Sequence, residues 1–318
     1  MDWSGTPNAG VRALLEAFAA QGVQPFDRMS VLQARVSVSA STRIGGPRTE
    51  VADVRDLLVD ARLPVRVYHP SPGSPLPLVV YFHGGGFVAG GVAVADRACR
   101  GLAVAAGVVV VSVEYRLSPE TPFPGPQEDC VAAVRWAVAH AAELGADPDR
   151  LVLAGDSAGA TLAASTSRTL RDGGGPVVVH QLLVYPTLAP PRGRTTPSLV
   201  DNAADFSMTT ASLDWFWDHH LAGAPATPEA APLLATDLAG LPPTTLVVAE
   251  FDPLRDEGVD YAHALEAAGV PVTLHAVPGT IHGFWWMAGA LPEAAELTAW
   301  LGTHLRAVLP GPSFDQVT

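Results

Sequence analysis

Residues 151–164 read Leu-Val-Leu-Ala-Gly-Asp-Ser-Ala-Gly-Ala-Thr-Leu-Ala-Ala. The apolar run at the start is typical of a buried strand, and the alanine-rich run after the serine is typical of a helix. Between them, Gly155-Asp156-Ser157-Ala158-Gly159 fits Gly-x-Ser-x-Gly, a sharp strand-to-helix turn that holds the serine hydroxyl clear of the sheet edge. This stretch therefore predicts an α/β fold with Ser157 as a nucleophile.

The serine of this turn has two interpretations. Gly-x-Ser-x-Gly arises by chance in many chains, and serine is also a favoured N-cap residue at the start of a helix. The strand before and the helix after Ser157 favour the nucleophile. In that arrangement the helix directs its N-terminal amides and the positive end of its dipole towards the serine, which stabilises negative charge there.

The alternation of short apolar runs with longer helical stretches continues through the chain from Leu78 onward. Such alternation is typical of βα units around a mostly parallel sheet flanked by helices. We therefore expect an α/β architecture around a single sheet. The expected strands cover residues 78–82, 108–113, 151–154, 177–184, 244–249 and 272–277, and the expected helices include 129–144, 158–171, 256–268 and 292–308.

Two regions interrupt the alternation. The first opens with Asn8, a candidate N-cap before an apolar series at helical spacing, and the second carries the aromatic cluster Trp215-Phe216-Trp217. We expect the two regions to form a helical cap over the carboxyl edge of the sheet, although a dispensable arm and an ordinary insertion are alternatives. The expected division is an N-terminal cap segment (residues 1–45), core (46–187), cap insertion (188–232), core (233–309) and a disordered tail (310–318).

A glycine loop follows the expected strand 78–82 directly, with the sequence His83-Gly84-Gly85-Gly86-Phe87. Its backbone amides are not covered by side chains, so they can converge on an oxyanion. The residue after the nucleophile, Ala158, would add its own amide. The loop therefore predicts an oxyanion hole beside Ser157.

The same loop has a dinucleotide-binding alternative. Gly84, Gly86 and Ala89 formally fit Gly-x-Gly-x-x-Ala after a strand, and Glu114 lies where a ribose-binding acid could be expected. Gly90-Gly91 prolongs the loop where a dinucleotide-binding fold begins a helix. This alternative also leaves the turn at Ser157 unexplained.

A catalytic acid is expected after the strand 244–249, where three carboxylates occur. Asp252 is the candidate because Pro253 fixes a turn beside it. Asp256 is better explained as the N-cap of the following helix, and Glu250 lies immediately after the strand. The alternative for Asp252 is the role of an Asx-turn residue.

A catalytic base is expected after the next strand, in residues 278–284. His282 lies there in a short glycine-containing loop, and the order serine, acid, histidine is that of α/β-hydrolases. Histidines placed within strands or helices, such as His275, His263 and His140, have packing or surface roles as the simpler explanation. Ser157, Asp252 and His282 together predict acyl transfer through a serine nucleophile.

Composition excludes several other classes of function. A net charge of −13 over 318 residues opposes binding to nucleic acids and to anionic membranes. All 19 basic residues are arginine, so mechanisms that need a lysine Schiff base or a phosphate-binding lysine are excluded. The two cysteines, Cys99 and Cys130, have no metal-binding or disulfide spacing. Because the N-terminus lacks a basic region followed by an apolar run, a soluble cytoplasmic protein is expected.

These residues resemble the bacterial hormone-sensitive-lipase-like carboxylesterases of the α/β-hydrolase superfamily. The resemblance rests on five segments in the same order, which cover roughly residues 78–284. They are His83 to Phe87 (the HGGG box), Tyr115 to Glu120 (YRLSPE, with Ser118 for the usual alanine), Gly155 to Gly159 (GDSAG), Asp252 to Gly258 (DPLRDEG) and Ile281 to Phe284 (IHGF).

The resemblance implies a site made of three groups of residues. Ser157, Asp252 and His282 would be the catalytic triad. The oxyanion hole would use the amides of Gly85, Gly86 and Ala158, with Gly84 as an alternative donor. Phe87, where the family more often has tryptophan, would shape the substrate pocket together with Trp215 and Phe216, although these aromatics could equally form the core of the cap.

The expected activity is that of a serine carboxylesterase, which hydrolyses short- to medium-chain carboxylic esters through an acyl-enzyme. No metal or cofactor is implied, and the expected partner is a small-molecule ester. An amidase or peptidase with the same triad, or a non-catalytic relative that keeps only the pocket, is the alternative. The natural substrate, the stereochemical preference and the oligomeric state are left open by the sequence.

Overall fold

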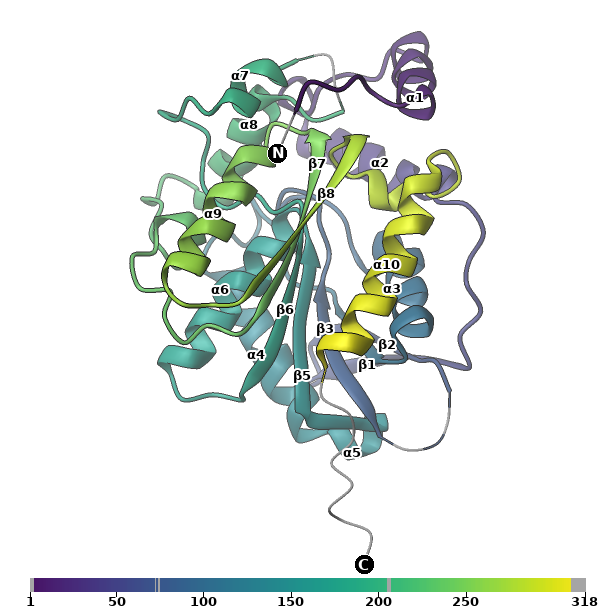
Figure 1. Cartoon of the computed structure of the whole chain (residues 1–318), viewed down its shortest axis with the longest axis vertical. Helices are drawn as coiled ribbons and strands as arrows, with labels where there is room; N and C mark the ends of the chain where they lie inside the picture. The colour runs from purple at the N-terminus through teal and green to yellow at the C-terminus, as the bar shows by residue number, and fades with distance from the viewer. Residues whose placement is uncertain (1–2, 72, 74, 205–206, 310–318) are drawn as a thin grey trace, which may run out of the picture.

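The computed structural model of the chain describes residues 3–71, 73, 75–204 and 207–309, and an eight-stranded sheet runs through its centre (Figure 1). The strand order is β1-β2-β4-β3-β5-β6-β7-β8. Strand β2 is antiparallel to β1 and β4, and the remaining neighbours are parallel, so the predicted mostly parallel sheet is confirmed. The strands are β1 (Asp53–Val59), β2 (Leu63–His69), β3 (Leu76–Phe82), β4 (Val109–Val113), β5 (Ala146–Asp156), β6 (Val178–Val184), β7 (Thr244–Phe251) and β8 (Val272–Ile281).

Alternate residues of the central strands enter two different cores. On β3, Leu78, Val80 and Phe82 join one apolar cluster, whereas Val79 and Tyr81 join the other. Helices α4, α6 and α9 cover the first face and α3 and α10 cover the second, so both faces of the sheet are buried (Figure 1). This arrangement explains why the central strands read as continuous apolar runs.

The helices agree with the expected segments except in one place. The stretch 129–144 is not one helix, because it divides at His140 into α4 and α5. The helices are α1 (Ala9–Ala20), α2 (Val31–Ala40), α3 (Val92–Ala106), α4 (Gly125–Ala139), α5 (Ala141–Leu144), α6 (Ala158–Asp172), α7 (Pro197–Asp201), α8 (Thr210–Leu221), α9 (Arg255–Ala267) and α10 (Pro292–Val308), with 3-10 turns η1 (Phe26–Arg28), η2 (Ser41–Ile44), η3 (Pro232–Leu234) and η4 (Phe284–Trp286).

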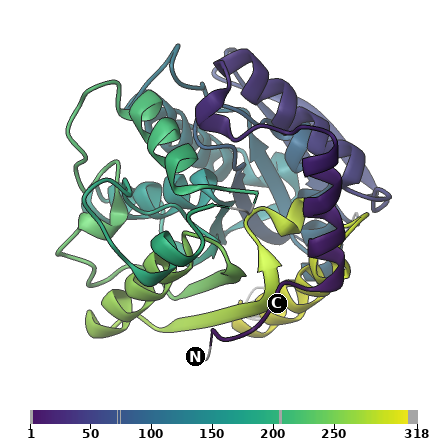
Figure 2. The ribbon, with the colours of Figure 1, turned by 90° about the horizontal axis from the view of Figure 1, so that it is seen from above.

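Helices α1, α2, α7 and α8 lie at the end of the molecule to which β7 and β8 point (Figure 1), and Figure 2 views them from above. The N-terminal region and the 188–232 insertion touch there, since Phe26 N donates to Ser212 Oγ at 3.1 Å and Ser212 Oγ donates to Asp27 at 2.9 Å. Asn8 occupies the N-cap position of α1, but its side chain donates to the Glu293 carboxylate and forms no cap hydrogen bond. The predicted disorder of residues 310–318 falls outside the described residues.

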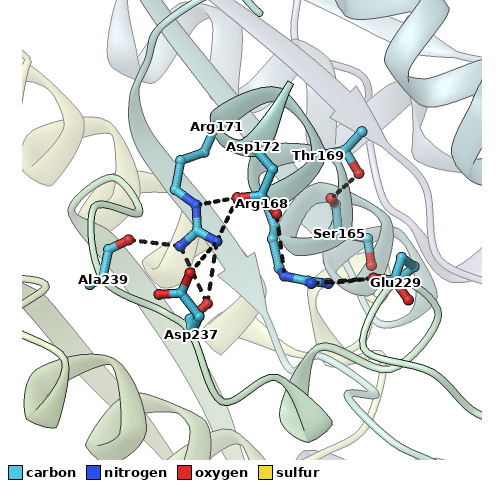
Figure 3. A network of polar contacts seen from close by, with 8 residues as sticks. All are labelled: Ser165, Arg168, Thr169, Arg171, Asp172, Glu229, Asp237 and Ala239. Atoms are coloured by element: carbon cyan, nitrogen blue, oxygen red, sulfur yellow. Dashed lines mark hydrogen bonds and ion pairs between the residues drawn. The ribbon is translucent and has the colours of Figure 1, made fainter. Parts of the chain in front are cut away.

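The far end of α6 is tied to the end of the insertion and to the chain that follows it (Figure 3). Arg168 pairs with Glu229 at 3.2 Å, and Arg171 Nη1 donates to the Ala239 carbonyl at 2.7 Å. Arg171 also pairs with Asp237 at 3.4 Å. Because α6 begins directly after Ser157, these contacts hold the helix that carries the serine turn.

Candidate active site

Ser157 lies at a tight turn between the end of β5 and the start of α6. Its backbone has φ 53° and ψ −123°, a conformation that is strained for a residue with a side chain. The flanking glycines are required: a Cβ on Gly155 would lie 2.3 Å from Gly159 C, and one on Gly159 would lie 1.9 Å from Phe82 O. The Ser157 side chain forms no cap hydrogen bond, so the N-cap interpretation does not describe this serine.

Ser157, His282 and Asp252 lie in one hydrogen-bonded line. Ser157 Oγ is 2.9 Å from His282 Nε2, and His282 Nδ1 is 2.7 Å from Asp252 Oδ2. Strand β7 ends one residue before Asp252, and β8 ends one residue before His282. The parallel strands thus bring three residues from distant parts of the sequence to one edge of the sheet. All three side chains are buried.

The Asp252 carboxylate uses its two oxygens for different partners. Oδ1 accepts from Leu254 N at 2.9 Å, which is an Asx-type turn, while Oδ2 faces His282. The two interpretations considered for Asp252 are therefore compatible. The Asn202 side chain also donates to the Asp252 carbonyl at 3.1 Å, so the insertion helps to hold this loop.

The two rival carboxylates have other partners. Glu250 lies within β7, not after it, and accepts from Gly279 N at 2.8 Å and from Gly5 N at 3.0 Å. Asp256 is not the N-cap of α9, because the helix already begins at Arg255. Its carboxylate accepts from Ser198 N at 2.7 Å. Neither carboxylate contacts His282 through a hydrogen bond among the described residues.

The backbone amides of the glycine loop divide into one that is bonded and two that are not. Gly84 N donates to Asp156 Oδ1 at 3.0 Å, which removes Gly84 as an alternative oxyanion donor. Within the described residues, the amides of Gly85, Gly86 and Ala158 have no hydrogen-bond partner. Three unpaired amides beside a serine hydroxyl suit the stabilisation of an oxyanion.

The dinucleotide-binding alternative fails at the start of α3. That helix begins at Val92, after both Gly90 and Gly91, and the Glu114 carboxylate accepts from Val92 N at 2.7 Å. An anionic pyrophosphate would need the amides at this helix terminus. A protein carboxylate already occupies that position, so Glu114 caps α3.

The three aromatic residues expected at a pocket lie in different surroundings. Phe87 is fully buried and stacks on His220 of α8, with ring centroids 3.8 Å apart. Phe216 lies against the glycine loop, since a Cβ on Gly86 would be 2.1 Å from its Cδ1. Its ring also contacts Phe26, with centroids 5.0 Å apart. Trp215 is only partly buried and its ring packs on Phe216 and His219.

Arg35 of α2 holds the end of the glycine loop, and sequence reasoning did not identify it. Its Nε donates to the Val88 carbonyl at 2.9 Å, and its Nη2 donates to the Ser118 carbonyl at 3.1 Å. It also forms an ion pair with Glu120. Nothing local distinguishes Arg35 from the other arginines of the chain. Its partners Ser118 and Glu120, however, belong to the YRLSPE segment, whose role was not explained by the triad.

Two features are absent from the described residues of the chain. No group of three or more histidine, cysteine, aspartate or glutamate residues there could hold a metal ion. No helix there is both long and apolar enough to span a bilayer. Cys99 and Cys130 are buried and unpaired, as helical core residues.

Comparison with known proteins identifies the family. A family model described as alpha/beta hydrolase fold matches residues 79–286. In sequence, the chain is 43% identical to "Esterase LipI" of Mycobacterium tuberculosis over 272 residues, which are 81% of this chain and 83% of the relative. It is 36% identical to "Ethyl acetate hydrolase" of Pseudomonas putida over 298 residues, 89% of this chain and 92% of that protein.

Solved structures agree with this result. A hyperthermophilic esterase from Pyrobaculum calidifontis matches with a TM-score of 0.88 and 36% identity, covering 95% of this chain and 98% of that one. A thermostable esterase from Pseudomonas putida ECU1011 matches with a TM-score of 0.91 and 32% identity, covering 97% and 99%. The chain therefore belongs to the α/β-hydrolase family, within its hormone-sensitive-lipase-like carboxylesterases.

Proposed function

We propose that the protein hydrolyses short- to medium-chain carboxylic esters through an acyl-enzyme on Ser157, with His282 as general base and Asp252 as its orienting acid. The observation that carries the proposal is the continuous line from Ser157 Oγ to His282 Nε2 at 2.9 Å and from His282 Nδ1 to Asp252 Oδ2 at 2.7 Å. Nucleophile, base and acid within hydrogen-bond reach are what serine acyl transfer requires.

In the first half of the reaction, His282 Nε2 takes the hydroxyl proton of Ser157 while Oγ forms a bond to the ester carbonyl carbon. The carbonyl oxygen becomes an oxyanion. When the tetrahedral intermediate collapses, the bond to the alkoxy oxygen breaks, and the His282 proton passes to the leaving alcohol. Asp252 stabilises the imidazolium that forms in between.

In the second half, water takes the place of the alcohol. His282 removes a proton from this water, the hydroxide oxygen attacks the acyl carbon, and the bond to Ser157 Oγ breaks with return of the proton to Oγ. The products are the carboxylic acid and free Ser157. In both halves, the oxyanion would be stabilised by the amides of Gly85, Gly86 and Ala158, which have no other hydrogen-bond partner among the described residues.

We further infer that residues 1–45 and 188–232 act as a cap that shapes the acyl site. Phe216 of the insertion lies on Gly86, and Phe26 of the N-terminal region lies on Phe216. Aromatic rings so close to the oxyanion amides leave little room beside the reacting carbonyl. This favours short acyl groups, in line with the name of the Pseudomonas putida relative, an ethyl acetate hydrolase.

The test is hydrolysis of p-nitrophenyl esters from acetate to longer acyl chains by the wild type and by Ser157→Ala. We expect the variant to lose essentially all turnover. Ser165→Ala is the matched control, because Ser165 is also a buried serine of α6 but its hydroxyl has no hydrogen-bond partner among the described residues. It should keep wild-type rates. Undiminished hydrolysis by Ser157→Ala would disprove the proposed nucleophile.

The amidase alternative is tested with a matched pair of substrates that share one acyl group, a p-nitrophenyl ester and a p-nitroanilide. Preference for the anilide would replace the esterase proposal with an amidase. A non-catalytic binding role predicts no Ser157-dependent turnover of either substrate.

A further inference from the structure

Asp156, the residue before the nucleophile, lies between the serine turn and the glycine loop. It ends β5 and is 1% exposed. Its Oδ1 accepts from Gly84 N at 3.0 Å and from the Tyr81 hydroxyl at 2.5 Å. One carboxylate oxygen therefore connects three segments: the end of β5, strand β3 and the glycine loop.

This connection fixes the loop at the residue that precedes the unpaired amides. A Cβ on Gly84 would lie 2.5 Å from Asp156 Oδ2 and 3.1 Å from Ser157 Cβ, so the loop backbone packs directly on the serine turn. Since the Gly84 amide is bonded to Asp156, rotation of the chain before Gly85 is restricted. Oxyanion donors are effective only when they are aimed before the charge develops.

We propose that Asp156 is a positioning residue for the oxyanion hole: its carboxylate accepts the Gly84 amide and so holds the amides of Gly85 and Gly86 towards Ser157, and its protonation loosens this hold. The inference rests on the proposed function, since it concerns the same reaction. The ionised form is the stronger acceptor, because hydrogen bonds to charged groups are about twice as strong as neutral ones.

The surroundings of Asp156 shift its pKa into the pH range in which esterase activity can be assayed. Burial raises the pKa of Asp156 to about 6, and the hydrogen bonds from Tyr81 and Gly84 and the nearby charge of His282 oppose that rise. Besides His282, four titratable groups among the described residues lie close enough to this carboxylate to interact with it electrostatically, and burial raises the pKa of each, so they stay neutral near pH 6. They are Tyr81 on β3, Cys99 on α3, Tyr115 after β4 and Tyr185 after β6.

Two variants separate the carboxylate from its charge. Asp156→Ala removes the acceptor, and we expect kcat to fall about 10²-fold, as for the loss of one oxyanion donor, with KM changed less than about threefold. Asp156→Asn keeps an acceptor oxygen at the same position but cannot ionise. It is neutral at every pH, like the protonated carboxyl, so we expect its kcat at pH 8 to lie between those of the wild type and Asp156→Ala.

The pH profile is the readout that a purely structural role would not change. In the wild type, protonation of both His282 and Asp156 lowers log(kcat/KM), so the acid limb should be steeper than one unit per pH unit. In Asp156→Asn only the base remains, and the slope should be one. Asp96→Asn is the matched control, because Asp96 is a buried carboxylate on α3 that accepts a tyrosine hydroxyl, from Tyr68 at 3.0 Å. It should keep the wild-type limb.

Wild-type kcat in Asp156→Ala, or a wild-type acid limb in Asp156→Asn, overturns the inference. Ser157→Ala in the same assay distinguishes this result from a failure of the proposed function. If Ser157→Ala is inactive while both Asp156 variants behave as wild type, only the role of Asp156 is wrong. If Ser157→Ala is active, the proposed nucleophile is wrong.

Discussion

Replacement of Gly86 by alanine perturbs the glycine loop at the point where the cap touches it. Gly86 has φ 63°, and its Cα faces the Phe216 ring. The added methyl would lie 2.1 Å from Phe216 Cδ1, far inside van der Waals contact. Either the ring or the Gly86 peptide has to move, and the Phe216 ring is itself held by Phe26.

The expected loss of stability in Gly86→Ala combines two free-energy costs. A left-handed φ costs an L-residue about 1–2 kcal/mol, and overpacking of a filled site costs about 1–3 kcal/mol more. If the peptide moves, the Gly86 amide leaves its proposed position in the oxyanion hole, and kcat should fall about 10²–10³-fold. We therefore expect a destabilised protein whose loss of kcat exceeds any change in KM.

The assay is p-nitrophenyl acetate hydrolysis with kcat and KM measured separately, together with a thermal melt. Gly107→Ala is the matched control, because Gly107 has φ 69° but a Cβ there would meet no atom of the described residues within 4 Å. It should lose stability by the backbone cost alone and keep kcat. The double variant Gly86→Ala with Phe216→Ala should regain at least about tenfold in kcat over Gly86→Ala, because the methyl then has room.

Two results would refute this reasoning. The first is a Gly86→Ala enzyme with kcat within about threefold of the wild type. The second is a double variant that is no faster than Gly86→Ala, since the ring would then not be the obstacle.

Three other predictions concern the acid, a buried histidine and the far end of α6. Asp252→Asn keeps the acceptor for Leu254 N but presents an amide to His282, so kcat should fall about 10⁴-fold with little change in melting temperature. Burial lowers the pKa of His180 to about 4, so the unfolded chain takes up its proton first and stability falls as pH drops from about 6.5 to 4. Between pH 7 and pH 4.5, the free energy of unfolding measured with urea should therefore fall by about 2–3 kcal/mol less in His180→Gln than in the wild type. An equal fall in the two proteins would contradict this. Arg171→Ala, which removes the contacts to Asp237 and Ala239 in Figure 3, should cost about 1 kcal/mol by chemical denaturation and leave kcat unchanged.

Strands and helices with strong local signals were predictable from the sequence. The buried strands around residues 78–82 and 151–154 and the helix 292–308 follow from apolar runs and helical spacing, and the structure has them within a few residues. Strands β1 and β2 were missed. Strand β1 is half exposed and interspersed with charged residues, so it lacks a continuous apolar run, and its pairing with β2 stabilises it instead.

The sequence also pointed to the three residues that the structure places in line. Ser157, Asp252 and His282 each stand directly after a strand of a parallel sheet, and the carboxyl ends of such strands meet at one edge. Their chain order and local turns were therefore enough to select them. Asp252 shows the limit of that reasoning, because its two interpretations excluded each other in sequence but occur together on its two oxygens.

By itself, then, the sequence of this protein determined the fold class, the serine turn and the candidate acid and base, because each is marked by a short local segment and by the order of these segments along the chain. Only the tertiary structure decided which loop amide is already used, since Gly84 donates to Asp156, a residue 72 positions away in the chain. It likewise decided that Phe216 lies on Gly86 and that Arg35 holds Val88. Such contacts join segments that are far apart in the sequence, and no local sequence pattern marks them. They follow from the packing of the folded chain alone.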